Sequence, residues 1–126
     1  MDLTPLVPQG RQIVESYGEG RFRVTGTLYQ GSVLVFPDRT AAWSVAMIAD
    51  LSEAALTEVA AAGKAGTIDL LLIGCGLRMT PISSALRAGL RAQGVVIETM
   101  DTGAAARTYN VLAAEGRKVA AALIAV

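Results

Sequence analysis

The chain has 126 residues, the length of one average domain, and its 52% share of hydrophobic residues can supply a single core. Its 11 basic residues balance its 11 acidic residues, so no net field attracts nucleic acid or an anionic membrane. Histidine is absent and Cys75 is the only cysteine, so we expect no intrachain disulfide and no metal site.

The N-terminus is predicted to differ from the rest of the chain: residues 1–11 form an irregular arm, and residues 12–126 form a single α/β domain. The arm contains an acidic residue and two prolines, and it lacks the apolar core of a signal peptide. The longest apolar run, residues 119–126, is too short to span a membrane. We therefore expect a soluble protein with no transmembrane segment, located in the cytoplasm.

Short strands punctuated by glycine are predicted next. The pattern indicates strands at residues 13–17, 21–24 and 32–36, with turns at Gly26 and Gly31. The segment 21–24 alternates charged and apolar residues, which is typical of a strand with one face in the core.

A further strand is predicted over residues 40–47, and it carries Trp43, the only tryptophan. Burial in the core is the commoner fate of such a side chain, and contact with a partner from an exposed strand face is the alternative. Together with the preceding strands, this segment predicts an antiparallel β region in the first half of the chain.

Hydroxyl side chains mark the expected helix starts. Ser52 is the expected N-cap of a first helix, which Gly63 is expected to end. Thr80 as N-cap and Pro81 at the first helical position predict a second helix, because the missing N–H of proline costs nothing there. Gly89 lies inside this helix, and we expect it to face the sheet and allow close packing.

In the second half of the chain, strands alternate with helices. Strands are predicted at residues 68–73, 95–99 and 118–125, and Thr102 is the expected cap of a third helix at residues 103–114. The order β-α-β-α-β implies crossover connections, a parallel component in the sheet, and helices packed against it.

A Gly-x-Gly turn follows the strand at residues 68–73, and ligands gather at such strand ends in α/β sheets. Gly74 and Gly76 match two glycines of the dinucleotide-binding fingerprint, but Met79 stands where the third glycine is required. A tight turn that needs small residues is therefore favoured over a nucleotide site, and we expect no bound cofactor.

The same turn is a candidate for anion binding. Backbone N–H groups at a helix start near Thr80, with Arg78 beside them, would suit a carboxylate or a phosphate. The alternative is that Arg78 is an ordinary solvated loop residue. Cys75 has no histidine to act as its base, so we favour a small half-buried turn residue over a nucleophile.

A second polar turn, at Asp101 and Thr102, leads into a helix that carries Arg107, Tyr109 and Asn110. These side chains form either a recognition surface beside the turn or a set of half-buried groups that tie the helix to neighbouring loops. From the helical spacing, we do not expect Tyr109 and Asn110 both to face the core.

Residues 101–110, followed by 115–117 and 120–124, resemble the signature of a small family of unknown function, the Mth938-like domain. Further matching residues are Tyr17, Gly18, Phe22, Gly26, Gly31, Trp43, Gly74 and Gly76. The family includes a mitochondrial assembly factor of complex I (NADH:ubiquinone oxidoreductase) and adipogenesis-associated Mth938-domain proteins of animals. The resemblance implies a three-layer α/β domain with a mixed central β-sheet, helices packed on it, and an additional small antiparallel β layer.

No settled enzymatic activity comes with this resemblance. Many relatives carry a cysteine near position 106, where this chain has Ala106, so no thiol chemistry is carried over. We therefore expect a non-enzymatic accessory or protein-interaction factor, in the assembly of complex I, that binds a protein partner and no nucleic acid. Whether it forms a homodimer stays open.

The alternative is a small-molecule or anion-binding domain, or an enzyme, with its site at the turns 74–80 and 101–103. No catalytic residue is assigned in either case. The candidate ligand- or partner-binding residues are Gly74, Gly76, Arg78, Thr80, Asp101, Thr102, Arg107, Tyr109 and Asn110.

Overall fold

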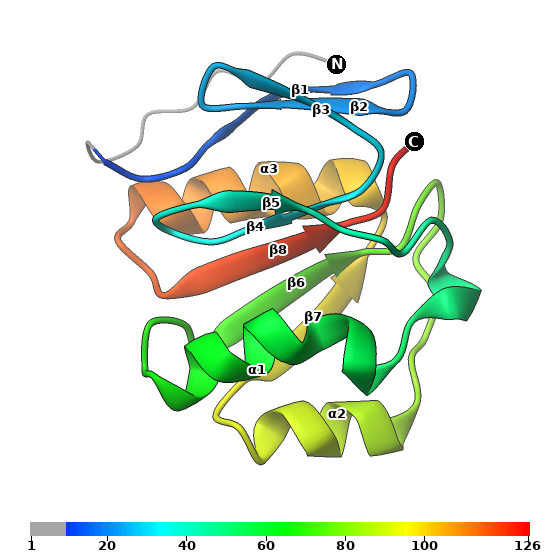
Figure 1. The fold of residues 1–126 in the computed structure, drawn as a ribbon, viewed down its shortest axis with the longest axis vertical. Helices are drawn as coiled ribbons and strands as arrows, with labels where there is room; N and C mark the ends of the chain where they lie inside the picture. Colours follow the sequence, from blue (N-terminus) through cyan, green and yellow to red (C-terminus); the bar gives the residue numbers. More distant parts are fainter. Residues whose placement is uncertain (1–9) are drawn as a thin grey trace.

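The computed structural model describes residues 10–126, and in this range the chain forms two β-sheets and three α-helices (Figure 1). The strands are β1 (Val14–Gly18), β2 (Arg21–Val24), β3 (Thr27–Gln30), β4 (Val33–Val35), β5 (Thr40–Ala42), β6 (Leu70–Gly74), β7 (Val96–Met100) and β8 (Val119–Leu123). The helices are α1 (Thr57–Lys64), α2 (Ser84–Arg91) and α3 (Thr102–Ala114), with the short 3-10 helices η1 (Ile48–Asp50) and η2 (Glu53–Leu56) before α1. Most of the predicted arm, residues 1–9, lies outside the described residues.

The central sheet is mixed, with the strand order β5-β4-β8-β6-β7. Strands β8, β6 and β7 are parallel, and β4 runs antiparallel to both β5 and β8. The predicted β-α-β-α-β order of the second half is confirmed. Gly74, at the end of β6, is level with Met100 of β7 and Leu123 of β8, so three carboxyl ends meet at one edge.

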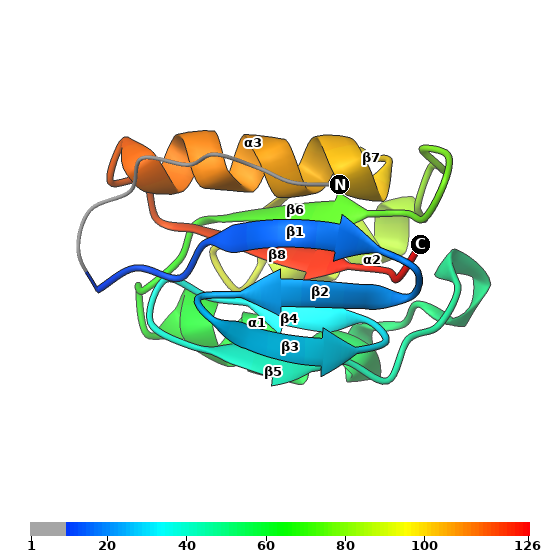
Figure 2. The ribbon, with the colours of Figure 1, turned by 90° about the horizontal axis from the view of Figure 1, so that it is seen from above.

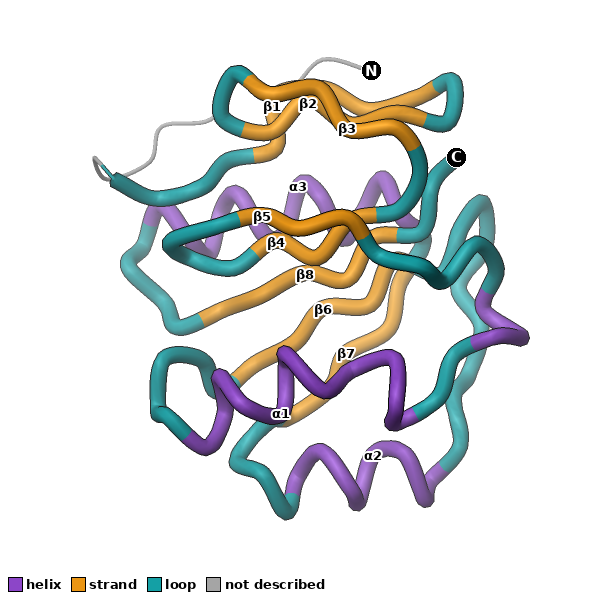
Figure 3. The backbone as a smooth tube through the Cα atoms, viewed as in Figure 1, coloured by secondary structure: helices purple, strands orange, loops and turns teal. Residues whose placement is uncertain are grey.

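Each face of the central sheet is covered, which completes the expected three layers (Figures 1 and 3). One face packs against η1, η2, α1 and α2, and the other packs against α3 and the small sheet side by side (Figure 2). Within β6, Leu71 and Ile73 belong to the first core and Leu72 to the second. This burial on both faces explains why the strand is apolar throughout.

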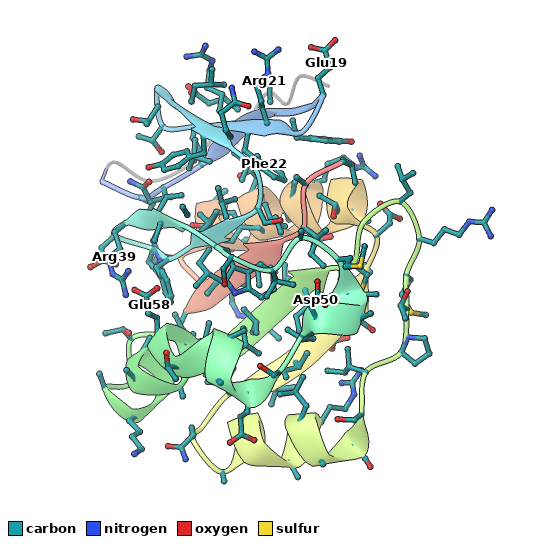
Figure 4. All side chains as sticks on the ribbon, turned by 45° about the vertical axis from the view of Figure 1, so that its right-hand side comes forward. Glu19, Arg21, Phe22, Arg39, Asp50 and Glu58 are labelled. Atoms are coloured by element: carbon teal, nitrogen blue, oxygen red, sulfur yellow. The ribbon has the colours of Figure 1, made fainter. Side chains whose placement is uncertain are left out.

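The small sheet has the order β1-β2-β3 and is antiparallel, as expected of the additional layer. Phe22 is fully buried toward the core, whereas Arg21 points outward, which confirms the predicted alternation in β2 (Figure 4). Strand β3 was not predicted, because the chain between Gly26 and Gly31 suggested only turns. Its side chains are mostly exposed, so the strand has no buried alternating face to reveal it.

The predicted strand at residues 40–47 is too long, since β5 ends at Ala42. Trp43 then turns into the core, where it is 7% exposed and its indole N–H donates to the carbonyl oxygen of Ala55 at 2.8 Å. Val45 is buried in the same core. The expected burial of Trp43 is therefore confirmed, and its hydrogen bond fixes the approach to α1.

The start of α2 is not at Thr80 and Pro81, as predicted, but at Ser84. The N-cap is Ser83, whose hydroxyl oxygen accepts from the N–H of Leu86 at 3.1 Å. Because Ser83 supplies the same capping group closer to the helix, Thr80 and Pro81 stay in an irregular segment.

Two glycines have roles other than those predicted. Gly63 lies inside α1 and does not end it. Glycine is needed there because a Cβ would overlap Val95 and the carbonyl oxygen of Gln93. Gly89 faces the carboxylate of Glu53 in η2 and not the sheet. Ser52 does cap as expected, but it caps η2, and its hydroxyl oxygen accepts from the N–H of Ala55.

Strand β7 is one of the two edge strands of the central sheet, and β5 is the other. The guanidinium of Arg87, on α2, donates to the carbonyl oxygen of Ile97 in β7 at 2.7 Å. Val96, next to it, is 44% exposed.

The expectation that Tyr109 and Asn110 would not both face the core is wrong. Helix α3 lies against the central sheet and also beside the small sheet, so two neighbouring directions of the helix are buried (Figure 2). The Tyr109 hydroxyl donates toward the carbonyl oxygen of Gln12 at 3.0 Å, and burial raises the pKa of this hydroxyl above its ordinary value. The Asn110 amide accepts from the N–H of Val14 at 2.9 Å and donates to its carbonyl oxygen at 2.8 Å.

Replacing Asn110 tests whether this amide attaches the small sheet. Asn110→Ala leaves the buried N–H and C=O of Val14 without their partner, and we expect a loss of about 1–3 kcal/mol in the free energy of unfolding. Urea denaturation measures it. Val111→Ala, at a residue 57% exposed on the same helix, is the control and should change little. Equal losses in the two variants would contradict the role of Asn110.

Candidate functional site

The Gly-x-Gly turn lies at the carboxyl end of β6, and its backbone groups are bonded within the chain. The carbonyl oxygen of Gly74 accepts from the N–H of Ile124 at 3.0 Å, and the N–H of Cys75 donates to the carbonyl oxygen of Met100 at 2.8 Å. The turn is thus tied to both neighbouring strands.

Thr102 completes this arrangement from the start of α3, where it is fully buried. Its hydroxyl oxygen accepts from the N–H of Gly76 at 3.0 Å, and its O–H donates to the carbonyl oxygen of Ile124 at 2.7 Å. Its own N–H donates to the carbonyl oxygen of Gly76 at 2.8 Å. The prediction that Thr102 caps α3 is therefore wrong. Asp101 is the cap, and its carboxylate accepts from the N–H of Ala104 at 2.8 Å.

The geometry accounts for both glycines of the turn. A Cβ on Gly74 would lie 2.8 Å from the Cα of Thr102 and 3.1 Å from the side chain of Leu123. Gly76 has a φ of +104°, in the region that side chains disfavour. The favoured interpretation of the turn, small residues required by tight packing, agrees with these contacts.

Arg78 and Thr80 lie in the irregular segment after the turn. Arg78 is exposed, and it is not beside a helix start, because α2 begins only at Ser84. The carbonyl oxygen of Thr80 accepts from the thiol of Cys75 at 3.5 Å. Cys75 is buried, so its thiol is a packing group of the turn.

Arg107 joins α3 to the small sheet. Its guanidinium donates to the hydroxyl of Tyr17 at 3.0 Å. The Tyr17 ring lies over Gly103, where a Cβ would come within 2.5 Å of the Tyr17 oxygen. Arg107 is thus bonded to the small sheet, whereas Arg78 is exposed in the segment after the glycine turn.

The structure brings together Gly74, Gly76 and Thr102, which contact one another at the strand ends. It places Tyr109 and Asn110 elsewhere, bonded to the segment that includes β1. Within residues 10–126, no group of three or more Cys, Asp or Glu side chains could hold a metal ion. No helix in this range is long and apolar enough to cross a membrane.

A groove with a volume of about 530 Å³ lies near the same edge of the sheet. Ile48 and Leu51 line one side, and Pro81, Ile82 and Leu86 line the other. Sequence reasoning missed this groove, because its walls come from two segments about 30 residues apart in the chain.

Apolar residues in loops beside the groove walls are a sequence signal that could have drawn attention to this region, although none of them lines the groove. Met47, Leu77 and Met79 are large apolar residues in loops, and their side chains are 58%, 85% and 56% exposed. Folding buries little of these side chains, so they are candidates for contact with a partner.

Comparison with known sequences gives a family and several relatives. Residues 14–124 match the family described as "Protein of unknown function (DUF498/DUF598)". An uncharacterized protein of Rhodobacter capsulatus is 40% identical over 111 residues, which cover 88% of this chain and 82% of that protein.

Assembly factor 3 of the NADH dehydrogenase [ubiquinone] 1 alpha subcomplex is also similar. The Danio rerio protein is 30% identical over 89% of this chain, and the human protein is 28% identical over 88%. The aligned parts are 63% and 59% of those two proteins, so this chain spans less than two thirds of their length.

Two solved structures share the fold and more than 25% of the sequence. An outer membrane protein from Bartonella henselae has a TM-score of 0.85 and 34% identity, and the match covers 93% of this chain and 97% of that one. A Mth938-like domain from Bordetella pertussis has a TM-score of 0.83 and 30% identity, with 98% and 92% coverage.

Substitution of Thr102 tests whether its hydroxyl bonds to Gly76 and Ile124 stabilise the fold. Thr102→Val keeps the shape of the side chain but leaves the Gly76 N–H and the Ile124 carbonyl unpaired, so we expect a loss of about 1–3 kcal/mol in unfolding free energy. Chemical denaturation measures this loss, and amide hydrogen exchange at Gly76 should become faster. Thr108→Val, half-buried on the same helix, is the matched control. A loss as large in the control as at Thr102 would argue against this stabilising role.

Proposed function

Because the chain belongs to the family of proteins of unknown function DUF498/DUF598, we propose that it is a non-enzymatic accessory factor that binds another protein during the assembly of respiratory complex I. The observation that carries this proposal is the similarity to NADH dehydrogenase assembly factor 3 over 88–89% of the chain. The similar region includes all three layers of the fold. The cytoplasm stays our expected compartment.

The geometry of the glycine turn supports binding of a protein over chemistry on a small molecule. The N–H of Gly76 donates to the hydroxyl oxygen of Thr102, and the hydroxyl of Thr102 donates to the carbonyl oxygen of Ile124. These are groups that an anion at the turn would need as donors. A partner protein instead requires exposed apolar surface, and Leu77 and Met79 supply it directly after the turn.

Co-purification from the source organism tests the proposal. The full chain with an affinity tag, expressed at its native level, should recover subunits of complex I or other assembly proteins. An untagged strain is the control for background binding, and fractionation of the same cells tests the compartment. Repeated recovery of the chain alone, under mild conditions, would count against an accessory role.

The alternative, an anion or nucleotide site at the turns 74–80 and 101–103, is tested by thermal stability. We expect phosphate, pyrophosphate and NADH to leave the melting temperature unchanged, because the N–H groups of Cys75, Gly76 and Thr102 are already bonded within the chain. A ligand at 100 times its Kd would add about 2.7 kcal/mol of stability. A concentration-dependent rise that disappears in Arg78→Ala would support the alternative instead.

A further inference from the structure

We propose that the apolar groove between η1–η2 and the segment 80–86 binds an apolar helical segment of a partner protein that carries lysine or arginine along one edge. The proposal rests on the proposed function, since it names where the partner docks and by what chemistry.

Most of the large side chains that line the groove are apolar. Ile48, Leu51 and Ile82 are half-buried and pack against the core that α1 and α2 form with the sheet. Leu86 is 8% exposed and belongs to that core. The volume of about 530 Å³ lies in the range of pockets that bind small molecules, so the groove has room for large side chains of a partner.

Exposed apolar residues flank both walls of the groove in the sequence. Among residues 10–126, six large hydrophobic side chains are exposed, and three of them are Met47, Leu77 and Met79. Met47 directly precedes Ile48 of one wall, and Met79 directly precedes Thr80 of the other. Methionine adapts its shape to a partner at small cost. Each wall of the groove is therefore preceded in the chain by an exposed methionine.

The charge at the groove is acidic. Glu53 lines it, and Asp50 lies between two lining residues, Ala49 and Leu51. Both residues are exposed, although the carboxylate of Glu53 also lies against Gly89 of α2, and neither residue is ion-paired within the described residues. The two ion pairs there, Glu19 with Arg21 and Arg39 with Glu58, lie elsewhere (Figure 4).

The negative charge of Glu53 and Asp50 favours a basic partner over a second copy of this chain. No lysine or arginine lines the groove, so a basic edge on the partner would face Glu53 and Asp50 without competition. A second copy of this chain is disfavoured, because a twofold interface would place the same carboxylates of both copies in one contact. Apolar anchors at helical spacing are the usual occupants of such grooves.

The first experiment uses the full chain and two labelled helical peptides. Both present leucines at helical spacing, and they differ only in having lysines or glutamates beside the leucine stripe. Fluorescence anisotropy should show the lysine peptide binding about tenfold more tightly, with the preference reduced at high salt. The double variant Asp50→Lys, Glu53→Lys should invert the preference. Equal binding of the two peptides, or no inversion, would overturn the proposal.

The second experiment repeats the co-purification with variants at exposed positions, which keep the fold. Leu77→Asp with Met79→Asp should reduce partner recovery by about tenfold, and Val111→Asp, on the opposite face of the sheet, should not. If both variants recover the partners that the unmodified chain recovers, the groove is not the docking site although the accessory function stands. If the unmodified chain recovers none, the accessory function itself fails.

Sedimentation of the unmodified chain provides the last discrimination. A dimer that Leu77→Asp with Met79→Asp converts to a monomer would show that a second copy occupies the groove, and it would overturn the proposal. A species of unchanged mass in both proteins agrees with a different protein as the occupant.

Discussion

The arrangement of the strand ends depends on two hydrogen bonds of the Thr102 hydroxyl. This hydroxyl accepts from the N–H of Gly76 and donates to the carbonyl of Ile124, so one buried atom joins the ends of β6 and β8 to the start of α3. Gly74 must lack a side chain for this contact to form. Gly74 and Gly76, which first suggested a cofactor loop, thus connect the strand ends to the start of α3. The chain then leaves the turn at the exposed Leu77.

A second constraint follows from the position of α3 between two sheets. A helix against one sheet buries one stripe, whereas α3 is buried along two, and the second stripe faces backbone groups near the edge of a small sheet. Backbone N–H and C=O groups require polar partners, and Asn110 supplies both. The polar residues that suggested a recognition surface at this helix thus include side chains that hold the layers together.

Local patterns predicted those parts of the fold whose signal is contained in a few neighbouring residues. The apolar run of β6, the alternation around Phe22 and the alternating second half are of this kind. The pattern failed where a distant partner decides: Ser83 was overlooked as the cap of α2, β3 has no buried face, and Tyr109 is buried by a layer far away in sequence. For the site, the glycines could be found but not the groove, whose two walls meet only in the folded chain.

The contact of Arg87 with the carbonyl of Ile97 limits the ways in which this protein can associate. A strand at the border of a sheet exposes unpaired backbone groups that invite another strand, and a cation placed on them blocks that extension. Association through β7 is thus opposed by a side chain of the protein's own second helix. A partner at this edge would meet the guanidinium of Arg87 at Ile97, so its contacts there would depend on side chains, which can distinguish sequences, more than on backbone pairing, which cannot.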